Sequence, residues 1–193
     1  MPRGITGKGL ATRRRIIEGA ARVLREQGTG GLEEIRVATG TSSSQLFHYF
    51  PGGKAELMLA VTSHEAGQVL EEQQPHLDDL GSWESWAAWA AELFARHERQ
   101  REHCGLSVLI GRLDPNDPAG REIVVAMYGQ WENALTRGIV TMQAAGKMRA
   151  DIDAVQAAAA LLAGIQGGIL MMLATGTTSH LKAVLDAGLA RLR

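Results

Sequence analysis

The sequence predicts an all-α protein, and three observations favour that class. Apolar residues recur at intervals of three and four through nearly every segment, as they do along helices with one buried face. No stretch of useful length alternates apolar and polar residues in the manner of a half-buried strand. The breaks between periodic segments carry the Gly and Pro residues that end helices. At 193 residues, 45% of them hydrophobic, the chain suffices for one large core or for a small domain joined to a larger one.

The first fifty residues predict three helices in succession. The first extends from Arg13 to Gln27, with Thr12 as its expected N-cap residue. A short second helix covers Leu32 to Thr39, and a third covers about 43–49.

The remaining chain predicts longer helices, which bring the total to about nine. A turn cluster that ends at Pro118 separates two groups of them. The expected segments are Lys54 to Glu72, Trp83 to His103, a short apolar piece from Gly105 to Arg112, Ala119 to Ala145, Asp151 to Thr175, and a last helix from Ser179.

The link between the second and third helices carries the most informative pattern of the chain. Gly40 stands where a chain that leaves a helix needs a left-handed residue. Ser42 followed by Gln45 matches a capping box, and Leu46 with Phe50 gives the third helix one apolar stripe. Its other faces carry uncharged polar or aromatic groups and no carboxylate. This combination is suited to the major groove of DNA.

The charge distribution agrees with that interpretation. Residues 1–56 hold nine Lys and Arg against five Asp and Glu, whereas residues 57–193 hold eleven against sixteen. A basic N-terminal segment followed by an acidic remainder suggests that the N-terminal segment binds a polyanion.

The segment 154–174 is apolar nearly all round, and two interpretations compete for it. Its length would allow it to cross a bilayer, but it is rich in Ala and Gly and lacks flanking Lys, Arg or aromatic belts. We therefore expect no membrane association and a helix buried on all sides, partly against a second copy in a four-helix bundle. The residues expected at this homodimer interface are Gly164, Gly168, Leu181 and Leu185.

In the order of its predicted helices and of the turn at Gly40, the chain resembles the TetR (tetracycline repressor) family of bacterial transcriptional regulators. The resemblance covers about residues 12–60, and its spacing agrees from Ile35 to Lys54. Beyond it, only the layout and the Trp131-Glu132 pair are similar to one effector-domain subgroup. The matching positions are Gly28, Ile35, Gly40-Thr41-Ser42, Leu46-Phe47-His48-Tyr49-Phe50 and Lys54. The departures from the family pattern are a shorter link from Gly28 to Ile35, Gly31 in place of a Thr or Ser cap, Arg36 in place of a small residue, and Phe47 in place of a Tyr that touches phosphate.

The resemblance implies a helix-turn-helix DNA-binding domain over residues 1–53 and an effector-binding and dimerisation domain over residues 54–193. Double-stranded operator DNA is the expected partner. Lys54 is expected on a phosphate rather than simply in solvent, and the backbone N–H groups of Gly52 and Gly53 are expected to be open to an anion. Gln45 either reads adenine or closes the capping box. The expected DNA-binding residues are Thr12, Arg13, Ser43, Ser44, Gln45, Phe47, His48, Tyr49 and Lys54.

The resemblance also implies a pocket for a small-molecule effector in the C-terminal domain. Aromatic and Met side chains can enclose an apolar molecule, although the same residues also serve as ordinary core. The expected lining is Met58, Trp86, Trp89, Leu93, Leu109, Met127, Trp131, Ile165 and Met171.

Other functions find little support in the residues. Motifs for phosphate loops, HExxH metal sites and nucleophile elbows are absent, so we expect no enzyme, no cofactor and no metal site. Cys104 is the single cysteine, which excludes an internal disulfide, and a reducing cytoplasm is the expected setting. The alternative function is a helical dimeric adaptor that has lost specific DNA binding.

Overall fold

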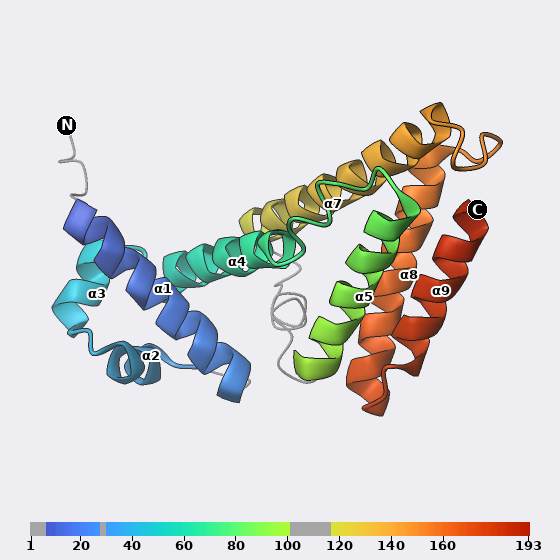
Figure 1. Cartoon of the computed structure of the whole chain (residues 1–193). Helices are drawn as coiled ribbons and strands as arrows, with labels where there is room; N and C mark the ends of the chain where they lie inside the picture. Colours follow the sequence, from blue (N-terminus) through green and yellow to red (C-terminus); the bar gives the residue numbers. More distant parts are fainter. Residues whose placement is uncertain (1–6, 28–29, 101–116) are drawn as a thin grey trace. The chain divides into compact units, whose positions relative to one another are not determined.

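The computed structural model of the protein describes residues 7–27, 30–100 and 117–193. Every regular element in those ranges is a helix (Figure 1), which confirms the predicted all-α class. The helices are α1 (Gly7–Gln27), α2 (Leu32–Thr39), α3 (Ser43–Tyr49), α4 (Gly53–Glu71), α5 (Trp83–Gln100), α7 (Pro118–Ala144), α8 (Ala154–Thr175) and α9 (Ser179–Leu192). The short helix expected at Gly105 to Arg112 lies outside the described residues.

The described residues divide into two compact units. The first contains the chain as far as Gln68 and the start of α7 as far as Val124. The second contains the chain from Val69 to the end of α5 and from Val125 to Arg193. Most of α4 therefore belongs to the same compact unit as α1, α2 and α3.

The first unit has a continuous apolar core. Ile16 and Leu24 of α1 are fully buried there, together with Ile35 of α2 and Leu57 of α4. Phe50, the residue that ends α3, belongs to the same core. The stripe formed by Leu46 and Phe50 thus anchors α3 as predicted and leaves its other faces for solvent.

α1 begins six residues before the predicted start. Thr12 lies inside the helix, where its Oγ1 donates to the carbonyl oxygen of Lys8 at 3.0 Å. The prediction that Thr12 is the N-cap residue is therefore wrong. Gly9 in the added turn is buried, so packing outweighs the low helix propensity of the glycines in this segment.

In the second unit, α8 and α9 lie side by side with the chain reversing at Gly176 (Figure 1). A Cβ built on Gly164 would lie 2.8 Å from Cγ1 of Val184, and one built on Gly168 would lie 2.8 Å from Cα of Leu181. Both glycines therefore allow close approach of α9 from the same chain, whereas the sequence suggested a helix of a second copy. Leu181 and Leu185 are likewise buried within this one chain, which corrects their predicted position on a dimer surface.

The apolar helix α8 begins at Ala154, three residues after the predicted start at Asp151. Its N-cap residue is Asp153, whose carboxylate accepts from Gln156 N–H at 2.9 Å. By length and composition alone, α8 is the one helix in the described ranges that could cross a membrane. However, α9 packs closely along α8, as expected for a helix within a folded helical domain.

Candidate nucleic-acid interface

The turn between α2 and α3 is held by backbone and threonine hydrogen bonds. Gly40 adopts φ +58, which favours glycine, and its N–H donates to the carbonyl oxygen of Val37 at 3.2 Å. Thr41 N–H donates to the carbonyl oxygen of Arg36 at 3.0 Å. Inside the turn the buried Thr39 hydroxyl donates to Thr41 Oγ1 at 2.9 Å. These contacts hold the start of α3 against the end of α2.

α3 begins with the capping box that the sequence predicted. Gln45 N–H donates to Ser42 Oγ at 3.2 Å, and Ser42 N–H donates to Gln45 Oε1 at 3.2 Å. The capping role of Gln45 is therefore confirmed, and its role in reading a base stays a prediction. Because the cap uses the side-chain oxygen, the amide nitrogen of Gln45 carries its remaining donors.

The outer faces of α3 are open to solvent. Phe47 is 52% exposed, whereas Leu46 is only 2% exposed. Tyr49 differs from the other candidates, since it is half-buried and packs against the core of the first unit. The exposed candidates for DNA contact are Ser43, Ser44, Gln45, Phe47 and His48.

Two cations lie near this element. The Arg13 guanidinium stands 5.0 Å from the centre of the Phe50 ring, a cation–π distance that ties α1 to the end of α3. Lys54 is exposed in the first turn of α4. Arg36, by contrast, pairs with Glu33 on its own helix at 2.8 Å, and this hydrogen bond is the main cause that lowers the pKa of Glu33. The Arg36 side chain therefore lies along its own helix, α2.

The backbone donors at the start of α4 are already used. Gly52 N–H donates to Glu56 Oε2 at 2.8 Å, and Gly53 N–H donates to the carbonyl oxygen of Phe50 at 2.8 Å. The prediction that these two N–H groups are open to an anion is therefore wrong. The reason is local, since Glu56 lies four residues after Gly52 and its carboxylate folds back onto the turn.

The double role of Gln45 leads to a testable prediction. A Gln45→Glu variant keeps an oxygen for the capping box, so we expect an unchanged Tm. It removes the amide donors and adds a negative charge on the exposed face, so DNA affinity is expected to fall about tenfold or more. Both are measured by thermal unfolding and by a binding titration. The control is Gln130→Glu on the exposed surface of α7, and equal DNA affinities of the two variants would remove Gln45 from the interface.

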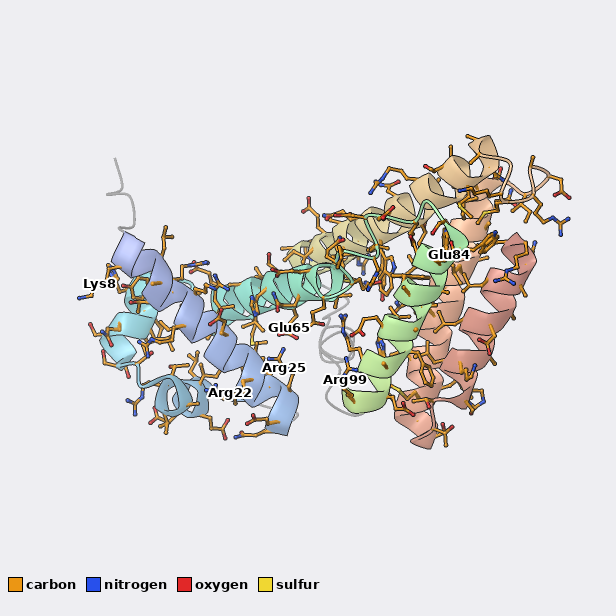
Figure 2. The ribbon with its side chains drawn as sticks, in the orientation of Figure 1. Lys8, Arg22, Arg25, Glu65, Glu84 and Arg99 are labelled. Carbon is orange, nitrogen blue, oxygen red and sulfur yellow. The ribbon has the colours of Figure 1, made fainter. Side chains whose placement is uncertain are left out.

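A buried ion pair in the same unit was not predicted from the sequence. Arg25 Nη1 of α1 lies 2.6 Å from Glu65 Oε1 of α4, and Figure 2 shows the two side chains directed toward each other. The Glu65 side chain is only 2% exposed. The sequence position of Glu65 could have predicted this pair. Glu65 continues the apolar stripe of Leu57 and Val61, so its side chain must be buried and needs a partner.

The predicted effector-lining residues do not all share one environment. Met58 is half-buried against the core of the first unit, whereas Met171 is 42% exposed on α8, outside any core. Leu109 and Cys104 lie outside the described residues. The buried members, all in the second unit, are Trp86, Trp89, Leu93, Met127, Trp131 and Ile165.

Polar groups accompany these buried aromatic side chains. Trp89 Nε1 donates to Gln73 Oε1 at 2.9 Å, and the Trp86 and Trp89 rings meet edge to face at 5.8 Å. His97 is buried with Nδ1 at 2.8 Å from the carbonyl oxygen of Leu93, and burial is the main cause that lowers its pKa. Within residues 7–27, 30–100 and 117–193, no group of three His, Cys, Asp or Glu residues is placed to hold a metal ion.

A short helix exposed after a glycine turn, anchored by a second short helix and by α1, defines a helix-turn-helix protein. Comparison with known families agrees with this class. Residues 16–61 match the description "Bacterial regulatory proteins, tetR family", and residues 84–187 match "Tetracyclin repressor-like, C-terminal domain". Because the second match alone covers more than half of the chain, the protein belongs to the TetR family of transcriptional regulators.

Solved structures share the whole fold at low sequence identity. A TetR regulator of Chloroflexus aurantiacus is 20% identical, with a TM-score of 0.79 over 96% of each chain. One from Haloarcula marismortui is 16% identical, with a TM-score of 0.82 over 95% of this chain and 97% of that one. GusR of Salmonella enterica is 22% identical, with a TM-score of 0.70 over 95% and 96%. No curated protein sequence matches the chain significantly.

Proposed function

We propose that this regulator is a ligand-responsive repressor that binds a palindromic operator as a homodimer. Residues 1–53 would contact double-stranded DNA in the cytoplasm, and residues 54–193 would bind a small, largely apolar effector that releases the operator. The observation that carries the proposal is the exposed face of α3, which presents hydroxyl, amide, imidazole and aromatic groups beside the capped turn. Such groups read base edges in the major groove.

The surface of α8 and α9 supports pairing of two copies. Val155 and Leu170 of α8 are more than half exposed, and a second copy packed on this face would remove their apolar surface from water. An apolar groove of about 250 Å³ lies between the two helices. Its lining is Ala157, Ala160, Leu161, Val184, Ala187, Gly188, Arg191 and Leu192. A second copy that covers this face would set the distance between two α3 helices to fit two half-sites.

Release by an effector follows from that geometry in physical terms. Both α3 helices must meet the operator at once, so a ligand that favours a different spacing weakens binding. The ligand does so only by as much as its affinity differs between the two spacings. Buried aromatic and apolar side chains in the second unit support a largely apolar ligand.

The experiment that tests the DNA-binding role is selection of bound duplexes from a random pool, followed by a gel titration. Lys54→Ala is expected to weaken binding of the selected duplex about tenfold near 0.1 M salt, because the variant neutralises one phosphate fewer and releases fewer counterions. For the same reason, the slope of log affinity against log salt should flatten by about one. Lys182→Ala on α9 removes the same charge from a Lys182–Asp186 pair and serves as the control.

Two outcomes would contradict the proposal. If the pool yields no enriched duplex, the adaptor function is favoured, and the use of the Gly52 N–H by Glu56 would fit that result. If the enriched duplexes contain no repeated half-site, the chain binds DNA without the proposed pairing of two copies.

A further inference from the structure

Among the residues that the structure describes, two buried hydrogen-bond donors of the second unit have no acceptor. Trp131 Nε1 of α7 and Gln166 Nε2 of α8 are buried atoms without a partner in the part of the chain that the structure describes. A buried donor left unpaired destabilises the folded state, and folded proteins contain few of them. Such atoms therefore indicate a place where another molecule supplies the acceptor.

Trp131 is an exception among the four tryptophans of the chain. The other three indole N–H groups donate to protein oxygens: Trp83 to the Lys147 carbonyl at 2.9 Å, Trp86 to the Leu80 carbonyl at 3.0 Å and Trp89 to Gln73 at 2.9 Å. The Trp131 side chain is no less enclosed, since the residue is only 1% exposed. An indole N–H can only donate, so no change of orientation turns it into an acceptor.

Tyr128, on the same helix as Trp131, contacts Gln166. Tyr128 OH donates to Gln166 Oε1 at 3.3 Å, which uses the oxygen of that amide and leaves its nitrogen. Tyr128 and Trp131 are three residues apart on α7, so they share one face of the helix. One turn to either side of Trp131, the buried residues on this helix are Met127, Ala134 and Leu135, which offer no side-chain oxygen.

We propose that the effector carries a neutral, carbonyl-type oxygen, which accepts from Trp131 Nε1 and Gln166 Nε2. This inference rests on the proposed function, because it names the chemistry of the effector. A carbonyl oxygen has two lone pairs and can accept from both donors. The acceptor is neutral because indole and amide carry no charge, and a carboxylate buried against them would lose its hydration without a compensating cation.

The first test needs no ligand and compares Trp131→Phe with Trp89→Phe in thermal unfolding. Both variants shrink the ring equally, but only Trp89→Phe deprives a buried partner, the Gln73 oxygen. We expect Trp89→Phe to melt about 4 °C below Trp131→Phe. A Trp131→Phe variant that melts as low as Trp89→Phe would show that the Trp131 N–H already has a partner, which overturns the proposal.

The second test uses three naphthalene probes that differ in one group: methyl naphthyl ketone, ethylnaphthalene and naphthoate. The ketone is expected to bind the wild type about tenfold more tightly than the hydrocarbon, read as a larger rise in Tm. Trp131→Phe should remove that difference, and so should Gln166→Glu, which keeps an oxygen for Tyr128 but loses the amide nitrogen. A ketone that never exceeds its hydrocarbon, or a naphthoate that binds most tightly, overturns the proposal.

The titration with the selected duplex is carried out on the same variants. Trp131→Phe should bind DNA like the wild type without probe and resist release by the ketone. Loss of DNA binding in the wild type, with the ketone preference retained, would count against the proposed function and leave the acceptor chemistry standing.

Discussion

A Gly168→Ala variant is expected to lose about 2 kcal/mol of unfolding free energy, although alanine favours helices. The added Cβ would lie 2.8 Å from Cα and 3.1 Å from N of Leu181. Backbone atoms cannot rotate away as a side chain does, so α9 must shift along its contact with α8. Overpacking of this kind costs about 1–3 kcal/mol.

The adjacent residue provides a matched control. Gly167 is exposed on the same helix, and a Cβ built there meets nothing within 4 Å. Gly167→Ala is therefore expected to gain up to about 1 kcal/mol through helix propensity and a less flexible unfolded chain. Chemical unfolding at one protein concentration measures both variants, because the proposed pairing of two copies would make stability depend on concentration. Equal stabilities would show that α9 does not lie against the backbone of Gly168.

The second large effect is expected at the ion pair between α1 and α4. Arg25→Met leaves the Glu65 carboxylate buried without its cation, and breaking a buried pair on one side costs about 3–5 kcal/mol. Since the Arg25 side chain is 34% exposed, we expect a smaller loss, about 2 kcal/mol. The measurement is the free energy of unfolding in a denaturant titration.

A double-mutant cycle separates the pair from the packing of the two side chains. Glu65→Met removes the buried charge, so adding Arg25→Met to it should cost little, which gives a coupling of about 2 kcal/mol. The control is Arg14→Met, because Arg14 and Glu18 are 77% and 45% exposed and such pairs contribute at most about 0.5 kcal/mol. A coupling near zero at Arg25 and Glu65 would mean that water already solvates the carboxylate.

Much of the N-terminal helix-turn-helix segment was predictable because its sequence signals are local. Gly40, Ser42 and Gln45 act on neighbouring backbone groups, so a turn, a cap and a capping box can be read from their order alone. Leu46 and Phe50 then decide which face of α3 is buried. The error at Gly52 and Gly53 is local as well, since the Glu56 carboxylate competes with an anion for the Gly52 donor.

The C-terminal segments were predictable as helices, but the sequence did not predict which helices pack against one another. The small residues Gly164 and Gly168 indicate that something approaches closely, and the pattern is the same whether that helix comes from this chain or from another. Likewise, Gln166 is a polar residue in an apolar helix, but its contact with Tyr128 joins residues thirty-eight positions apart. Contacts of that range depend on how the helices pack, which periodicity does not encode.

The capping bond of Gln45 has a consequence for the choice of base. Adenine in the major groove needs both an acceptor and a donor from a glutamine, whereas guanine N7 and O6 and thymine O4 need only donors. As long as the Gln45 oxygen stays on Ser42 N–H, the side chain offers its two amide hydrogens alone. If Gln45 reads a base, as we predict, its capping bond would bias it toward base edges that offer lone pairs, such as guanine N7 and O6 or thymine O4.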